Sequence, residues 1–152
     1  HIPSATPPAV IHGDYHLDNT LAARDKPEIL AIIDWELATV GDPYMDVALM
    51  LMFWGDYRTQ EPPAFSTLQA LSRRSGVISR RELAGRWAEG LGRPLHNMNF
   101  YMALAFWRLA AIIEGAYGLH VVGKLDSDYA RGLEYDVPAL LAEAERAAAG
   151  DW

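Results

Sequence analysis

Cysteine is absent from this 152-residue chain, and lysine occurs only at Lys26 and Lys124. The lack of cysteine excludes disulfide bonds and cysteine-ligated zinc. It also favours a reducing, cytoplasmic location, because disulfides persist in oxidising compartments. Basic residues are few: 13 lysines and arginines stand against 20 acidic residues, a net charge of −7. Since nucleic-acid binding depends on clustered lysine and arginine, no nucleic-acid partner is expected.

A long uninterrupted apolar run is missing as well. The longest candidate, residues 100–116, contains Arg108 and Glu114, whereas a membrane span needs about 18 or more apolar residues. No membrane partner is therefore expected. Residues 1–8 are rich in proline and lack the basic-then-apolar order of a signal peptide. We expect them to be a linker within a single domain of residues 1–152, because this length can bury one hydrophobic core.

Two polar stretches follow apolar runs. Residues 12–19 read His-Gly-Asp-Tyr-His-Leu-Asp-Asn after an apolar approach, and Asp34 ends a second apolar run. A charged group at the end of an apolar segment loses hydration unless metal or hydrogen bonds compensate, so such placements usually serve chemistry. Asp14 and Asn19 stand five residues apart, as the base and a metal ligand do in the kinase pattern H-R-D-x-x-x-x-N. Asp34 follows where a second metal ligand would be needed.

The segment between these stretches predicts a β-hairpin. Residues 20–23 and 28–33 have strand composition, and residues 24–27 form a four-residue polar turn. The open ends of this hairpin carry Asn19 and Asp34. Because neighbouring strands lie about 4.8 Å apart, both side chains could share one ion.

The remainder is helical in pattern, so the predicted class is α+β, mostly helical, with a small hairpin carrying the catalytic and metal-binding loops. Asp42 and Pro43 form a helix start signal, and Ser79 with Glu82 forms a capping box closed by Gly92. The predicted helices span residues 44–54, 64–75, 80–91, 97–117 and 136–149, with residues 55–63 and 121–124 as loops. The helix over residues 97–117 is expected to end at Gly118.

Several residues of the motifs have two interpretations. His12 could be a general base or metal ligand, but a ring that hydrogen-bonds backbone and braces the loop is favoured. His12, Asp14 and His16 also suggest zinc, yet no fourth ligand appears at a zinc-site spacing. His16 could contact a phosphate or substrate, or be a solvated loop residue. Asp46 interrupts an apolar helix, so we expect it to brace the catalytic loop through hydrogen bonds.

Three further polar residues are weaker candidates for contacts with substrate or phosphate. Glu36 follows Asp34 by two residues and could be a further ligand or a polar strand end. Glu114 and Tyr117 lie near the end of an apolar helix and could line a substrate pocket, although long buried helices commonly carry a polar tip.

Taken together, these motifs resemble the aminoglycoside phosphotransferase and choline kinase-like family, within the protein-kinase-like fold. The resemblance covers residues 9–54, and it is carried by His12-Gly13-Asp14-x-x-x-x-Asn19, Ile33-Asp34-Trp35-Glu36 and Gly41-Asp42-Pro43-x-x-Asp46. Trp35 and the helix around residues 99–117 resemble the subgroup associated with acyl-CoA dehydrogenases.

The resemblance implies a role for each motif. Asp14 would orient the substrate hydroxyl and accept its proton, while Asn19 and Asp34 would hold Mg²⁺ on the phosphates of ATP. His12, Gly13 and Asp46 would shape and hold the loop. Such a reaction needs mostly positioning and charge neutralisation, which oxygen ligands and Mg²⁺ supply.

The glycine-rich loop and strand lysine with which kinases clasp ATP do not precede His12. We therefore interpret the chain as the C-terminal lobe alone, and we expect it not to turn over ATP by itself. Its expected partners are a small-molecule hydroxyl substrate and the missing N-terminal lobe, with a homodimer through the exposed lobe face left open. Two other functions stay open: a non-catalytic binding module derived from that lobe, and a metal-dependent hydrolase using His12, Asp14 and Asp34.

Overall fold

The first half of the chain forms two small antiparallel sheets. The computed structural model describes residues 2–4, 6–55 and 71–152. The strands are β1 (Ala9–Ile11), β2 (Thr20–Ala22), β3 (Ile29–Ile32) and β4 (Thr39–Gly41), with 3-10 turns at Leu17–Asn19 and Trp35–Leu37. β1 pairs with β4, and β2 pairs with β3. The predicted hairpin is confirmed with slightly shorter strands, and its register sets Thr20 opposite Ile32.

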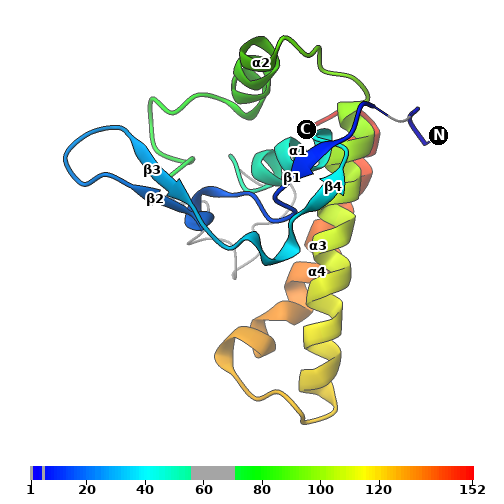
Figure 1. Ribbon diagram of the computed structural model, residues 1–152. Helices are drawn as coiled ribbons and strands as arrows, with labels where there is room; N and C mark the ends of the chain where they lie inside the picture. The colour runs from blue at the N-terminus through cyan, green and yellow to red at the C-terminus, as the bar shows by residue number, and fades with distance from the viewer. Residues whose placement is uncertain (1, 5, 56–70) are drawn as a thin grey trace.

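Four helices are found among the described residues: α1 (Tyr44–Met52), α2 (Arg80–Leu91), α3 (Met98–Val121) and α4 (Asp128–Ala148). Figure 1 shows α3 and α4 as a long antiparallel pair, with α1 against the upper part of α3. β1 and β4 lie beside α1, and the β2–β3 hairpin extends away from it to the left. The predicted mostly helical α+β class is confirmed.

The core lies where α1, α3 and α4 meet. α1 is apolar nearly all round, and such a helix is stable only when it is surrounded. Tyr101 of α3 donates a hydrogen bond to Asp42 Oδ2 over 2.7 Å, just before α1. Burial is the main cause that raises the pKa of the Tyr101 phenol, and the hydrogen bond to the Asp42 carboxylate is the second. The phenol therefore stays protonated and donates. The fully buried side chains include Leu51, Met52, Met102, Phe106, Leu133 and Leu140.

Local start and stop signals were predicted well for α2. The Ser79 side chain accepts a hydrogen bond from the Glu82 N–H, and the Glu82 carboxylate accepts one from the Ser79 N–H. The Ser79 N–H and the Ser79 hydroxyl both donate to this carboxylate, and these two bonds lower the pKa of Glu82. Gly92 closes the helix in the left-handed conformation, with φ of 60°.

Two predicted helix boundaries were wrong. α3 continues through Gly118 to Val121, because one glycine costs only about 1 kcal/mol in a helix. α4 begins eight residues before Asp136, where the Ser127 side chain caps the Ala130 N–H. Pro138 therefore lies inside α4, although it cannot donate the hydrogen bond of a regular turn. Asp136 is fully buried within the helix and does not cap it.

Smaller differences concern the flanks of α1. The helix ends at Met52, two residues before the predicted end. Within the polar stretch of residues 12–19, residues 17–19 form a 3-10 turn. The predicted helix over residues 64–75 lies outside the described residues up to residue 70, and residues 71–75 form turns. The predicted loop at 55–63 lies outside them from residue 56.

One described helix, α3, is long and apolar enough to cross a membrane by length and composition alone. A core helix of a globular protein passes the same test, so this is weak evidence. In the structure α3 packs on α1 and α4.

The α3–α4 contact can be tested with two adjacent leucines. Leu140 is fully buried, whereas Leu141 is 41% exposed. We expect Leu140→Ala to lower the free energy of unfolding by about 2–5 kcal/mol, because it removes buried surface and leaves a cavity. The matched change Leu141→Ala should cost about 1 kcal/mol or less. Urea unfolding followed by circular dichroism measures both; equal losses would contradict the observed face of α4.

Candidate active site

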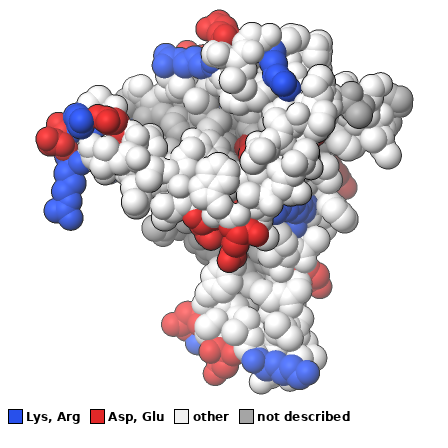
Figure 2. All heavy atoms as spheres, viewed as in Figure 1, with Lys and Arg blue, Asp and Glu red and all other residues white. Residues whose placement is uncertain are grey.

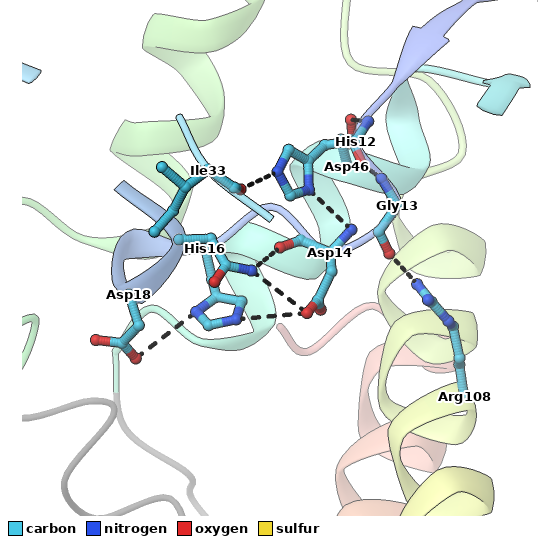
Figure 3. A network of polar contacts seen from close by, with 9 residues as sticks. His12, Gly13, Asp14, His16, Asp18, Ile33, Asp46 and Arg108 are labelled. Carbon is cyan, nitrogen blue, oxygen red and sulfur yellow. Dashed lines mark hydrogen bonds and ion pairs between the residues drawn. The ribbon is translucent and has the colours of Figure 1, made fainter. Parts of the chain in front are cut away.

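His12 ties the polar loop to the end of the hairpin. Its ring is buried, and its Nε2 lies 2.7 Å from the Ile33 carbonyl oxygen. On the other side, the Asp14 N–H lies 3.3 Å from Nδ1. A carbonyl can only accept and a backbone N–H can only donate, so the ring is neutral with its proton on Nε2. Figure 3 shows this bridge, and the Trp35 ring packs against His12 with centroids 4.7 Å apart.

The backbone of the loop is held from α1 by Asp46. One carboxylate oxygen accepts the His12 N–H over 2.6 Å, and the other accepts the Gly13 N–H over 2.9 Å. These are the hydrogen bonds to the loop that the apolar surroundings of Asp46 predicted. Charge-assisted bonds of this kind are among the stronger ones in proteins, so the loop is fastened to a core helix.

Gly13 occupies a place that no other residue fits without strain. Its φ of +83° lies in the left-handed region, and an added Cβ would lie 2.5 Å from the Leu37 carbonyl oxygen. The glycine therefore allows the loop to run closely beside the 3-10 turn that follows Asp34.

A further hydrogen bond to the loop comes from Arg108 of α3, and it was not predicted. The Arg108 Nη1 donates a hydrogen bond to the Gly13 carbonyl oxygen over 2.7 Å, across 95 residues of sequence (Figure 3). Sequence reasoning noted Arg108 only as an interruption of an apolar run. A charged residue inside such a run is a signal that it has a buried partner, but the sequence does not identify that partner.

Asp14 and Asn19 lie together on this loop. The Asp14 side chain is 38% exposed, so it is accessible from solvent. The Asn19 amide nitrogen donates to the Asp14 backbone oxygen over 2.8 Å and lies 3.4 Å from Asp14 Oδ2. Because a carbonyl oxygen accepts only from a donor, the amide nitrogen must face Asp14. Asn19 Oδ1 is then directed elsewhere and can act as a ligand.

Asp34 stands at the other open end of the hairpin. The Ile33 N–H donates to the Asn19 carbonyl oxygen over 2.9 Å, so Asp34 is one residue from the rung that includes Asn19. Asp34 is exposed and has φ of 66° and ψ of 51°. A positive φ is uncommon outside glycine, and such conformations cluster at functional sites.

The arrangement offers hard oxygen ligands of a kind that suits Mg²⁺. They are the Asp34 carboxylate and Asn19 Oδ1. Within the described ranges no group of three or more histidine, cysteine, aspartate or glutamate residues could hold a metal ion. The predicted pair is an aspartate and an asparagine, so it falls outside that type of cluster.

A cavity of about 280 Å³ opens beside Asp14 and His16. The His16 ring packs on Phe53 with centroids 4.7 Å apart, and its nitrogens lie 3.8 Å from an Asp14 oxygen and 3.6 Å from an Asp18 oxygen. The other lining residues are Leu37, Leu49, Phe53, Arg108, Leu109 and Ile112.

The structure does not bring every candidate to this cavity. Glu114 is exposed on α3, and Tyr117 contacts the His120 ring with centroids 6.4 Å apart. Glu36 is exposed in the 3-10 turn after Asp34. None of the three is among the described residues that line the cavity.

Comparison with known proteins matches this chain to phosphotransferases, both by sequence and by structure. A family model described as "Phosphotransferase enzyme family" matches residues 1–92. A crystal structure of a Ralstonia eutropha JMP134 protein assigned as an aminoglycoside phosphotransferase matches with a TM-score of 0.72 and 29% identity, over 92% of this chain and 42% of that one.

Two curated relatives are longer proteins. Acyl-CoA dehydrogenase family member 10 of Mus musculus is 34% identical over 132 residues, which are 84% of this chain and 12% of the relative. Acyl-CoA dehydrogenase family member 11 of Homo sapiens is 33% identical over 121 residues, 78% of this chain and 15% of the relative. The chain thus spans a small part of each.

The need for Gly13 can be tested against a matched glycine. Gly76 has a nearly equal φ of +84°, but a Cβ added there would meet no described atom within 4 Å beyond its chain neighbours. Gly76→Ala should cost about 1–2 kcal/mol, the penalty of a left-handed alanine. Gly13→Ala should cost about 1–3 kcal/mol more, because Leu37 must move. Urea unfolding measures the difference; equal losses would contradict the close approach of the loop to Leu37.

Proposed function

Because the chain belongs to the phosphotransferase enzyme family, we propose that it is the catalytic lobe of an ATP- and Mg²⁺-dependent enzyme that phosphorylates a hydroxyl group of a small molecule. The order of its motifs and the structural similarity to the Ralstonia protein support this assignment. The main support for this proposal is the placement of Asp14. Its carboxylate is partly exposed at the edge of a cavity. The loop that carries it is held by hydrogen bonds at the backbone N–H groups of Gly13 and Asp14.

In this proposal Asp14 is the base. Its carboxylate accepts the proton of the acceptor hydroxyl as that oxygen forms a bond to the γ-phosphorus of ATP, and the bond to the bridging oxygen of ADP breaks. The reaction has a loose transition state, so catalysis depends mostly on position. A rigid loop around Asp14 suits this requirement, since His12, Asp46 and Arg108 restrain the backbone next to it.

Asn19 and Asp34 are the residues that we propose to hold Mg²⁺. Asn19 is nine-tenths buried and has its amide nitrogen fixed by Asp14, which favours its oxygen as a ligand. Asp34 supplies a carboxylate from a left-handed backbone position beside the same rung. When bound, Mg²⁺ would neutralise charge on the nucleotide phosphates.

The names of the longer relatives do not decide the role of this chain. It spans 12% of one acyl-CoA dehydrogenase family member and 15% of another, and the family model that covers residues 1–92 describes phosphotransferases. We therefore propose phosphoryl transfer, and not dehydrogenation, as the chemistry of this segment.

We further propose that the nucleotide-clamping lobe of the same protein covers the hairpin face, and that this chain alone is inactive. Figure 2 shows charged side chains at the tip of the hairpin and few elsewhere on it. The apolar side chains exposed on the hairpin and directly after it are Leu21, Ile29, Leu30, Ile32, Ile33, Trp35 and Leu37, and Val10 and Val40 are exposed on the β1–β4 sheet. Such a surface usually marks an interaction site, and the matched Ralstonia chain extends well beyond the shared 42%.

The role of Asp14 as the base can be tested in the full-length protein, by measuring ATP consumption with a library of hydroxyl compounds. With an acceptor found, Asp14→Asn should lower kcat by about 10²–10⁴-fold, because it removes general-base catalysis. The control Asp126→Asn alters an exposed carboxylate between α3 and α4 and should leave kcat unchanged. Full activity in Asp14→Asn would remove Asp14 from the mechanism. No transfer by the wild-type protein to any acceptor would favour the non-catalytic binding module.

The metal site is tested by titrating Mg²⁺ at saturating ATP. Asp34→Asn should raise the Mg²⁺ concentration that gives half the maximal rate by about tenfold or more. Even mutation of residues that only hydrogen-bond to metal ligands weakens metal binding by about 10–100-fold. Asp25→Asn makes the same charge change in the exposed hairpin turn and should not shift the curve. Binding of MgATP measured by calorimetry provides a readout without turnover. Superimposable titrations of wild type and Asp34→Asn would exclude Asp34 as a ligand.

A further inference from the structure

We propose that Arg108 is a positioning residue for phosphoryl transfer, which fixes the orientation of the peptide group between Gly13 and Asp14. This inference rests on the proposed function, in which Asp14 is the base. It starts from the 2.7 Å hydrogen bond that Arg108 Nη1 donates to the Gly13 carbonyl oxygen (Figure 3).

The peptide group that follows Gly13 is held at both of its polar ends. Its oxygen accepts from Arg108, and its N–H, which belongs to Asp14, lies 3.3 Å from His12 Nδ1. A peptide group is planar, so fixing the oxygen and the N–H sets the rotation of the whole unit. That rotation sets the position of the Asp14 Cα and the direction of its N–Cα bond, from which the side chain extends. The bonds from the Asn19 amide to the Asp14 backbone oxygen and carboxylate then restrain the torsions that follow.

Gly13 makes this restraint necessary. The residue has no Cβ, and glycine reaches both left- and right-handed backbone regions at little cost. The Asp46 carboxylate fixes the N–H of Gly13, but that bond belongs to the preceding peptide group. Rotation about ψ of Gly13 would leave it intact while turning the Asp14 carboxylate away. Among the contacts described, Arg108 and His12 oppose this rotation at the peptide group itself, and the Asn19 amide opposes it at the next backbone oxygen and at the carboxylate.

Arg108 is suited to the task by its location. It is half-buried in the middle of α3, between the buried residues Phe106 and Ala110. Its guanidinium is always charged and has five N–H donors in a rigid plane. A lysine at this position would keep the charge but would offer a single flexible ammonium group. Arg108 also lines the cavity beside Asp14. The alternative role to be distinguished is therefore direct contact of Arg108 with the acceptor.

The test uses the full-length protein with Arg108→Met, Arg108→Lys and the control Arg131→Met. Arg131 makes its ion pairs with Asp126 and Asp128 at the start of α4. In Arg108→Met we expect kcat to fall by about 10–100-fold, because small misplacements of reacting groups have effects of this size. The KM for ATP and for the acceptor should change by less than about threefold, since binding is not removed. Arg108→Lys should keep part of kcat, and added guanidinium should restore part of it in Arg108→Met.

A second readout does not depend on turnover. Hydrogen exchange in residues 9–19 should become about tenfold faster in Arg108→Met, because the loop opens locally. Exchange in the helix peptides of α3 should remain as in the wild type, which separates a local effect from unfolding. Arg131→Met should leave both regions unchanged.

Two results would overturn the inference. Unchanged kcat and loop exchange in Arg108→Met would show that the Gly13 peptide group needs no support from α3. A rise in the acceptor KM with constant kcat would make Arg108 an acceptor-binding residue. Absence of phosphoryl transfer by the wild-type protein would defeat the proposed function, whereas the exchange measurement would still decide whether Arg108 orders the loop.

Discussion

The loop that carries Asp14 depends on one interaction, the two hydrogen bonds from the His12 and Gly13 N–H groups to the Asp46 carboxylate. A carboxylate on a core helix is costly unless donors satisfy it, and the loop N–H groups need acceptors for the same reason. Each side therefore stabilises the other. Since α1 is packed against α3, the loop acquires the rigidity of the core, although it is a segment of irregular backbone at the surface.

The features that the sequence predicted correctly are those set by neighbours in the chain. The hairpin follows from two strand-like runs and a polar turn, and the start of α2 follows from Ser79 and Glu82. The hydrogen bonds of Asp46 were foreseen because a carboxylate in an apolar helix must have a partner. The sequence predicted these partners in the catalytic loop, but it did not identify the two N–H groups. Local patterning thus defined most of the loop and its support from α1.

The features that could not be predicted depend on contacts between distant segments. The bond from Arg108 spans 95 residues, and no spacing rule links α3 to the loop. The left-handed backbone of Asp34 has no signal in the residue type, since aspartate also occurs in ordinary turns. The start of α4 was missed for a related reason. Asp-Val-Pro is typical of a helix start, yet Asp136 is buried in the helix, and packing against α3 outweighs the cost of an internal proline.

In the proposed reaction, the contacts that orient Asp14 are largely separate from those that would select the acceptor. His12, Asp46 and Arg108 all bind backbone groups of the loop, so their effect does not depend on which molecule occupies the cavity. Apart from Arg108, the cavity wall is formed by side chains that do not hold the loop, among them Leu37, Phe53 and Ile112. Substitutions in that wall can alter the shape of the site without changing the direction of the carboxylate. α3 contributes to both parts, because Arg108 restrains the loop and lines the cavity, where Leu109 and Ile112 also contribute to the wall. A shift of α3 along α4 would therefore change both the loop that carries Asp14 and the shape of the cavity. A change in a single apolar wall residue would alter the shape of the cavity alone.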